Sequence, residues 1–347
     1  MLGFEKILFV AALCASVAAP GAELASSDGR ETLSLSGYAT GYAIYDGLGE
    51  DGLDLSRHGR LEASAGHDFG GGLSLGATAQ LVTYPGRDRT KPFGEAYVFS
   101  EGPLGRVEIG RAKNITRKMH ISAPDVGPLL VTDTYHFARS ILPGGFSFLD
   151  STAIRTDQYA NKLNAVSAPV AGFQAAGSYM PGQGGDDFGR AWSANAKYSA
   201  GDAFAIALGG AKFQNVDYPG RSQAASREEY SAGMKFYLHG WQLSASGRRV
   251  LEHGEYGVGS DEGYSLDYGV AYETGPLKTS LSCYRSSAEG SRAAAGDDRA
   301  EFVLLSWRWS LLDGLDILGS AGRMTYRTED GAAFVGAIAA AGVEIYF

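Results

Sequence analysis

The feature that most constrains the fold of this chain is an alternation of apolar and polar side chains with a period of two. The clearest run sets Leu73, Leu75, Ala77, Ala79 and Leu81 against Ser74, Gly76, Thr78 and Gln80. Successive side chains of a β-strand point to opposite faces, so each such run predicts a strand with one apolar and one polar face.

The connectors between these runs alternate between short and long. Short connectors such as residues 68–72 and 274–276 contain Gly with Asp or Pro, which is typical of tight turns. Longer polar stretches, such as residues 46–55 and 252–263, lie between them. This rhythm is typical of a transmembrane barrel whose strands run up and down. A large soluble β-sandwich is the alternative fold, and it does not explain the alternation of short and long connectors.

The pattern therefore predicts an all-β fold, a transmembrane antiparallel β-barrel of about sixteen strands, an even number as closure requires. The expected strands span residues 32–45, 56–68, 73–84, 93–100, 104–111, 157–167, 172–181, 189–198, 203–213, 228–237, 241–250, 264–273, 277–286, 299–310, 315–327 and 333–347.

Composition and charge argue against other classes. After the N-terminal segment no uninterrupted apolar run reaches about 18 residues, so no transmembrane helix is predicted. The formal net charge of −9 argues against nucleic acid as a partner, because phosphates need a basic surface. Cys283 is the only cysteine after residue 22, so no internal disulfide is expected.

The N-terminus has the layout of a secretory signal peptide. Lys6 is followed by a short apolar run at residues 7–17 and then by small residues, and the run is too short to cross a bilayer as a helix. Residues 1–22 are therefore expected to be removed. The rest of the chain, 23–347, is expected to form a single barrel domain.

One connector is far longer than the others. Residues 112–156 separate the fifth and sixth expected strands, and a loop of this length is usually functional or disordered. It contains apolar residues throughout, including Met119, Leu129, Phe137 and Phe148, so it is able to pack. We expect it to fold into the lumen against the wall. The alternative is an external lid with a small core of its own.

Three segments resemble the general porins of Gram-negative bacteria. The hairpin that contains residues 95–99 and 105–111 ends in Gly110-Arg111, as the porin hairpin does before its constriction loop. Residues 167–173 resemble the Ser-Pro…Gly-Phe turn that follows that loop. The C-terminal strand ends in Phe347, as in the strand that the outer-membrane assembly machinery recognises.

The resemblance implies a barrel in the outer membrane of a Gram-negative bacterium, with sixteen strands, a homotrimeric assembly, and passive diffusion of small hydrophilic solutes and ions. Outer-membrane lipid, lipopolysaccharide and the assembly machinery are then the expected partners. The small residues of 334–341 are a separate indication of close association between copies in lipid.

The resemblance also implies a transverse field at the constriction, with basic wall residues facing acidic loop residues. Arg111 matches the family position directly, and Arg60 lies on a strand where the family carries wall arginines. Arg57 has the opposite parity to Arg60 and is expected at the rim. The full set of candidates is Arg57, Arg60, Arg111, Arg155 and Lys162 on the basic side, and Asp125, Asp133 and Asp150 on the acidic side. Each aspartate is alternatively a turn cap within the loop.

The acidic balance of the whole chain suggests weak cation preference. Two other functions stay open: a substrate-specific outer-membrane channel, and a hydrolase carried on a barrel, although no Gly-x-Ser-x-Gly motif accompanies the six histidines. No cofactor is expected, apart from calcium on the loop carboxylates Asp261, Glu262, Asp297 and Asp298, for which solvated loop charge is the alternative.

Overall fold

The computed structural model describes residues 22–26, 29–47, 53–83, 93–132, 134, 138, 142, 148–154, 159–182, 189–216, 225–253, 262–289 and 296–347. These ranges contain the short helix α2 (Ile115–Met119) and the strands β1 (Ala22–Ala25), β2 (Glu31–Asp46), β3 (Leu53–Asp68), β4 (Ser74–Thr83), β5 (Phe93–Gly102), β6 (Gly105–Ala112), β7 (Ala160–Ser167), β8 (Phe173–Met180), β9 (Ala191–Ala200), β10 (Phe204–Val216), β11 (Ala225–Leu238), β12 (Trp241–His253), β13 (Gly263–Thr274), β14 (Leu277–Glu289), β15 (Asp297–Leu312), β16 (Leu315–Arg327) and β17 (Ala333–Tyr346).

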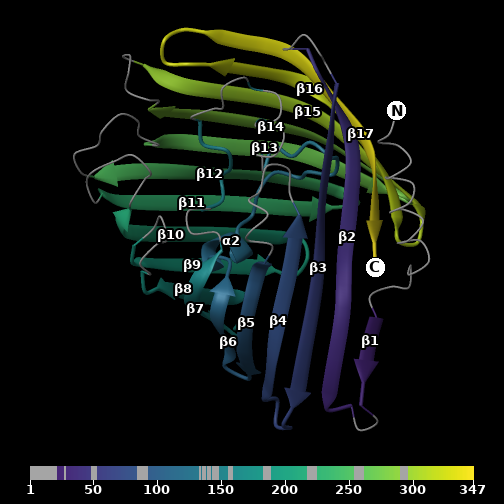
Figure 1. Cartoon of the computed structure of the whole chain (residues 1–347), viewed down its shortest axis with the longest axis vertical. Coiled ribbons are helices and arrows are strands. Elements are labelled where there is room, and N and C mark those ends of the chain that lie inside the picture. The colour runs from purple at the N-terminus through teal and green to yellow at the C-terminus, as the bar shows by residue number, and fades with distance from the viewer. Residues whose placement is uncertain are drawn as a thin grey trace.

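Sixteen of the described strands, β2 to β17, form a closed antiparallel barrel (Figure 1). Each strand pairs with the next along the chain, and β17 closes the ring on β2 from Ile338↔Asp46 to Tyr346↔Tyr38. The predicted fold class and all sixteen expected strands are confirmed, and no strand boundary differs from its prediction by more than three residues. Sequential hairpins leave no free edge among these strands, as a lipid environment requires.

The short strand β1 was not predicted. Its residues pair with the start of β2, from Ala22↔Leu35 to Ala25↔Thr32, next to the part of β2 that β17 leaves unpaired. Residues 1–21 lie outside the described part of the chain, so the signal peptide stays a prediction.

The expected alternation is present along the wall. In β13, Leu266 and Tyr268 are exposed while Ser265 and Asp267 are buried. Residues at alternate positions of a strand share one face of the wall, and we call each such set a parity. The exposed parity carries large apolar residues around much of the barrel, such as Trp307 on β15. Because this parity is apolar and the barrel is closed, it is the face that contacts lipid, and the buried parity lines the interior.

The described parts of the long connector pack against that interior parity. Leu129, Val131 and Phe148 form one apolar cluster with wall residues of β2, β15, β16 and β17, including Tyr42 and Phe302. No helix in the described ranges is long and apolar enough to cross a membrane.

Candidate functional site: the channel interior

The first half of the long connector follows the buried face of the wall from β7 towards β16. It starts with α2, which contacts β7 to β10. Asn114 caps this helix by accepting a hydrogen bond from the Thr116 backbone N–H (3.0 Å), and Ser193 on β9 donates to the same side chain (2.8 Å). One polar side chain therefore both starts the helix and fixes it to the wall.

Beyond the helix, backbone groups of residues 121–129 bond to successive strands. The Ala123 N–H donates to Asp267 on β13 (2.8 Å), and Ser282 on β14 donates to the Pro124 carbonyl. Further along, the Leu129 N–H donates to Ser320 on β16 (3.4 Å). As residue number rises from 123 to 129, the connector therefore moves around the wall from β13 to β16.

The second half returns along the same wall. Tyr284 on β14 donates to the Leu149 carbonyl, Ser265 on β13 donates to the Ser151 carbonyl (2.8 Å), and Thr152 donates to Asp267. The two halves also bond to each other, since Ser151 donates to the Thr132 carbonyl (2.8 Å). Beyond α2 the described connector is thus a double layer whose hydrogen bonds go to β12–β14 and β16.

The side chains that hold this layer are mainly small hydroxyl residues that sequence reasoning missed. Buried serines occupy the interior parity of β9 and β11–β16: Ser193, Ser231, Ser244, Ser246, Ser265, Ser280, Ser282, Ser306 and Ser320. Gly233 on β11 also allows the connector backbone to approach the wall closely, because a Cβ there would lie 2.1 Å from the Ile121 carbonyl oxygen. In the sequence, the serines recur on the inward positions of consecutive strands. This pattern indicates a part of the wall that a backbone segment can approach closely.

The predicted basic residues fall on both faces of the wall. Arg60 and Lys162 share the interior parity. Arg57 lies on the exposed parity of β3, so its side chain and that of Arg60 are on opposite faces of the strand, as predicted. Arg111 pairs with Ala96 and Asn161 and has the parity of the exposed Ile109, so the structure does not group it with Arg60. Arg155 lies outside the described residues.

The predicted acidic residues of the connector lie within the double layer where they are described. Asp125 accepts a hydrogen bond from the Thr132 N–H (2.8 Å), and the Asp150 carbonyl accepts from the backbone and hydroxyl of Thr134. Asp133 lies outside the described residues. The roles of these residues in a constriction stay predictions.

Two connector lysines, Lys113 and Lys118, form ion pairs with acidic residues of the wall. Lys118 contacts Glu108 on β6 (2.6 Å) and Glu95 on β5 (3.4 Å), and Lys113 contacts Glu95 (3.6 Å). This is the reverse of the polarity that the resemblance implied for the constriction. Both carboxylates lie on the interior parity of their strands, which is the signal that identifies them in the sequence.

A second buried charge cluster joins β11 and β12. Glu229 accepts from Arg227 (2.7 Å) and from Arg248 (2.7 Å), and Arg227 also contacts Glu252 (3.0 Å). Arg248 further donates to the Ser151 carbonyl of the connector (3.3 Å). The cluster therefore links the wall to the returning half of the double layer.

Two titratable side chains of the connector have pKa values far from their ordinary values. Burial, with smaller effects from Arg248 and Arg117, lowers the pKa of His120 to about 4, so this imidazole is neutral at neutral pH. Burial raises the pKa of Asp125 to about 7, partly offset by its hydrogen bonds with Thr132.

The described residues contain no group of three or more metal-binding side chains. Of the predicted calcium ligands, Glu262 contacts Arg249, Asp297 accepts from Ser287, and Asp298 accepts from the Glu329 N–H. Asp261 lies outside the described residues. Ser246 and His120 approach to 3.5 Å, but Ser246 donates to Asp267 instead, so this group lacks the serine–histidine–carboxylate order of a hydrolase.

A family model described as Gram-negative porin matches residues 10–329. The chain belongs to this family. Solved structures agree on the fold: Salmonella typhi OmpF in complex with daunomycin (14% identity, TM-score 0.70, 94% of this chain and 100% of that chain), the anion-selective porin from Comamonas acidovorans (16%, 0.67, 91% and 100%), and the trimer form of Vibrio cholerae OmpT (10%, 0.67, 92% and 100%). No curated protein matches the chain.

This porin is therefore an outer-membrane channel through which small hydrophilic solutes and ions diffuse passively, and it is not an enzyme. Its strands cross the membrane many times, and its buried parity is the channel interior.

Proposed function

We propose that residues 112–156 lie within the lumen and narrow this porin to a single constriction. The observation that carries the proposal is the set of hydrogen bonds from the connector backbone to buried wall residues on β13, β14 and β16. An external lid would bond to the loops at the barrel rim. The hydrogen bonds of the double layer go to β12–β14 and β16, which leaves the wall around β3 and β4 for solutes.

The open side carries Arg60 and Glu62 on β3. Because β3 and β11 are eight steps apart in a ring of sixteen, Arg60 lies across the barrel from the strand against which Ile121 packs. Arg60 stacks on Tyr38 (5.4 Å) and has no carboxylate partner among the described residues. An unpaired cation on one side of a narrow aqueous passage orders water and favours polar solutes over apolar ones.

Replacement of residues 116–153 by a short Gly-Ser linker tests the constriction. Single-channel conductance in planar bilayers is expected to rise severalfold and larger uncharged sugars to enter, because the double layer no longer occupies the lumen. Shortening of residues 183–188, a connector between two other strands, is the control and is expected to leave conductance unchanged. An unchanged conductance in the linker variant would place the segment outside the passage.

We further propose that the porin is a homotrimer, like the trimer form of Vibrio cholerae OmpT. The outward face of β17 and β2 carries a patch of small side chains where the two strands pair, in contrast to the many large outward residues of β11–β15. The patch consists of Ala337, Ala339, Ala341, Gly37, Ala39, Gly41 and Ala43, and larger residues of the same two strands, such as Leu33, Tyr45 and Val343, border it. Small side chains allow close approach between copies in lipid, where packing drives association.

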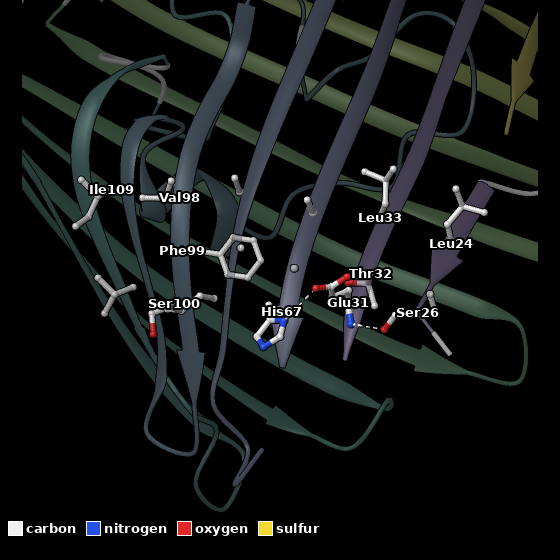
Figure 2. A pocket seen from close by; sticks show the side chains of 17 residues that line it. Leu24, Ser26, Glu31, Thr32, Leu33, His67, Val98, Phe99, Ser100 and Ile109 are labelled. Carbon is white, nitrogen blue, oxygen red and sulfur yellow. Dashed lines mark hydrogen bonds and ion pairs between the residues drawn. The ribbon is translucent and has the colours of Figure 1, made fainter. Parts of the chain in front are cut away.

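An apolar groove continues this small surface across β1 to β6 (Figure 2). Its volume is about 980 Å³, and its lining includes Leu24, Leu33, Leu75, Val98 and Ile109. We propose that this groove and the outer face of β17 form one contact surface for neighbouring copies, with lipid and lipopolysaccharide around the rest of the barrel.

Recognition by the outer-membrane assembly machinery through Phe347 also remains a proposal. Phe347 exchanges two backbone hydrogen bonds with Gly37 (2.9 and 3.0 Å), so the last residue completes the seam between β17 and β2. A C-terminal strand that closes the barrel is well placed to be held by an assembly factor until the seam forms.

A further inference from the structure

A second polar cavity lies beneath residues 120–126, at the end of the barrel with the short turns. Its volume is about 290 Å³, and its wall includes three lysines from three strands: Lys197 on β9, Lys235 on β11 and Lys278 on β14. All three share the interior parity, and each lies within four residues of a short turn. We call this the basic pocket.

The basic pocket has an excess of positive charge. Lys278 contacts Glu273 (2.6 Å), whereas Lys197 and Lys235 have no carboxylate partner among the described residues. Lys235 lies over the ring of Tyr237 (5.1 Å), a contact that leaves its charge uncompensated.

The connector side of the pocket adds no cation, and Asp125 carries less than a full negative charge near pH 7. His120 and Asp125 both line it, and the pKa values given above make His120 neutral and Asp125 partly protonated near pH 7. Ser122 and Gln242 supply further polar groups. Three flexible ammonium groups and these neutral donors suit an oxygen-rich anion.

We propose that the basic pocket is a binding site for small oxyanions, of which a dicarboxylate is the representative, on the exit side of the constriction. The inference rests on the constricted pore proposed above. Oxyanions that pass the connector meet Lys197 and Lys235 before they reach the end of the barrel with the short turns. The local concentration of oxyanions therefore rises at these two lysines. The pore then prefers anions locally although the whole chain is acidic, because the charges beside the passage outweigh the average.

Succinate tests the pocket, with neutral succinamide as the matched probe. In planar bilayers at about 0.1 M KCl, where screening is moderate, succinate is expected to reduce wild-type chloride current in a saturable way. Succinamide at the same concentration should have no effect. Equal reduction by both compounds would overturn the proposal, because it would then depend on size and not on charge.

The variant series assigns the effect to residues. In the K197Q/K235Q double variant the half-blocking succinate concentration is expected to rise at least tenfold, while K197R/K235R, which keeps both charges, retains the block. K212Q removes a lysine from the lipid-facing parity and serves as the control. Block that persists unchanged in K197Q/K235Q would overturn the site. A linker variant with unchanged conductance would instead refute the constriction, so the two failures are distinguishable.

Discussion

Glu229 is the residue on which the buried charge cluster of the wall depends. It is fully buried and accepts from both Arg227 and Arg248. Removal of one partner from a buried ion pair leaves uncompensated charge, which is far more costly than loss of an exposed pair. The adjacent Glu228 pairs with Lys212 on the lipid-facing parity, where that lysine side chain is 52% exposed.

We therefore expect E229A to lower the free energy of unfolding by about 3–5 kcal/mol, and E228A by no more than about 1 kcal/mol. Urea-induced unfolding of the refolded porin in lipid vesicles measures both. Similar losses in the two variants would show that the cluster contributes no more than an exposed pair.

Asp125 makes docking of the connector depend on pH. Its pKa in the folded porin, about 7, lies above the ordinary value of 3.8, so the folded state holds the proton more tightly than the unfolded state. The stability that this group contributes is therefore fully present below about pH 4 and is lost as pH rises through about 7. The double layer is therefore held less firmly at pH 8 than at pH 5.

Open-channel current noise should report this loosening, with roughly a twofold or larger increase in brief closures between pH 5 and pH 8. D125N keeps an acceptor for the Thr132 N–H and removes the titration, so its noise should be the same at both values. D202N, in an exposed turn, should behave as wild type. Noise in D125N that still rises with pH would assign the effect to another group.

At the scale of elements, the strands were predictable and the connector was not. Alternation is set by residues two apart, so β13 could be placed from its own ten or so positions. The position of the described connector residues depends on pairs far apart in the chain, such as Ala123 with Asp267, which are 144 residues apart. Strand β1 was missed because four residues are too few to show a period.

At the scale of the whole molecule, the outer surface is divided between large and small side chains. Many outward residues of β11–β15 are large, as expected of a lipid-facing wall, whereas the outward residues where β17 pairs with β2 include the small patch Ala337, Ala339, Ala341, Gly37, Ala39, Gly41 and Ala43. Figure 1 shows β17 and β2 side by side where the barrel closes, and their pairing places Ala341 next to Ala43. If this surface joins the copies of a trimer, bulk added there must weaken association.

A341W tests this directly. We expect it to convert most of the trimer to monomer in mild detergent, as measured by light scattering after gel filtration. A232W, on the exposed parity of β11, adds the same bulk to the lipid-facing surface and should leave the trimer intact. A trimer that survives A341W but not A232W would place the contact on the other side of the barrel.

Local patterns in the sequence were enough to predict the barrel, its sixteen strands, the alternation of faces along each strand and the resemblance to porins, because each of these follows from short-range alternation, turn chemistry or a local motif. Only the tertiary structure brought inward-facing residues from distant strands together. It paired acidic wall residues with the basic connector residues Lys113 and Lys118, and it gathered three lysines from three separate strands. The physical reason is that parity is a local property of a strand, whereas the height of a residue in the barrel, and its neighbours across the lumen, follow from ring closure and from the docking of one long connector.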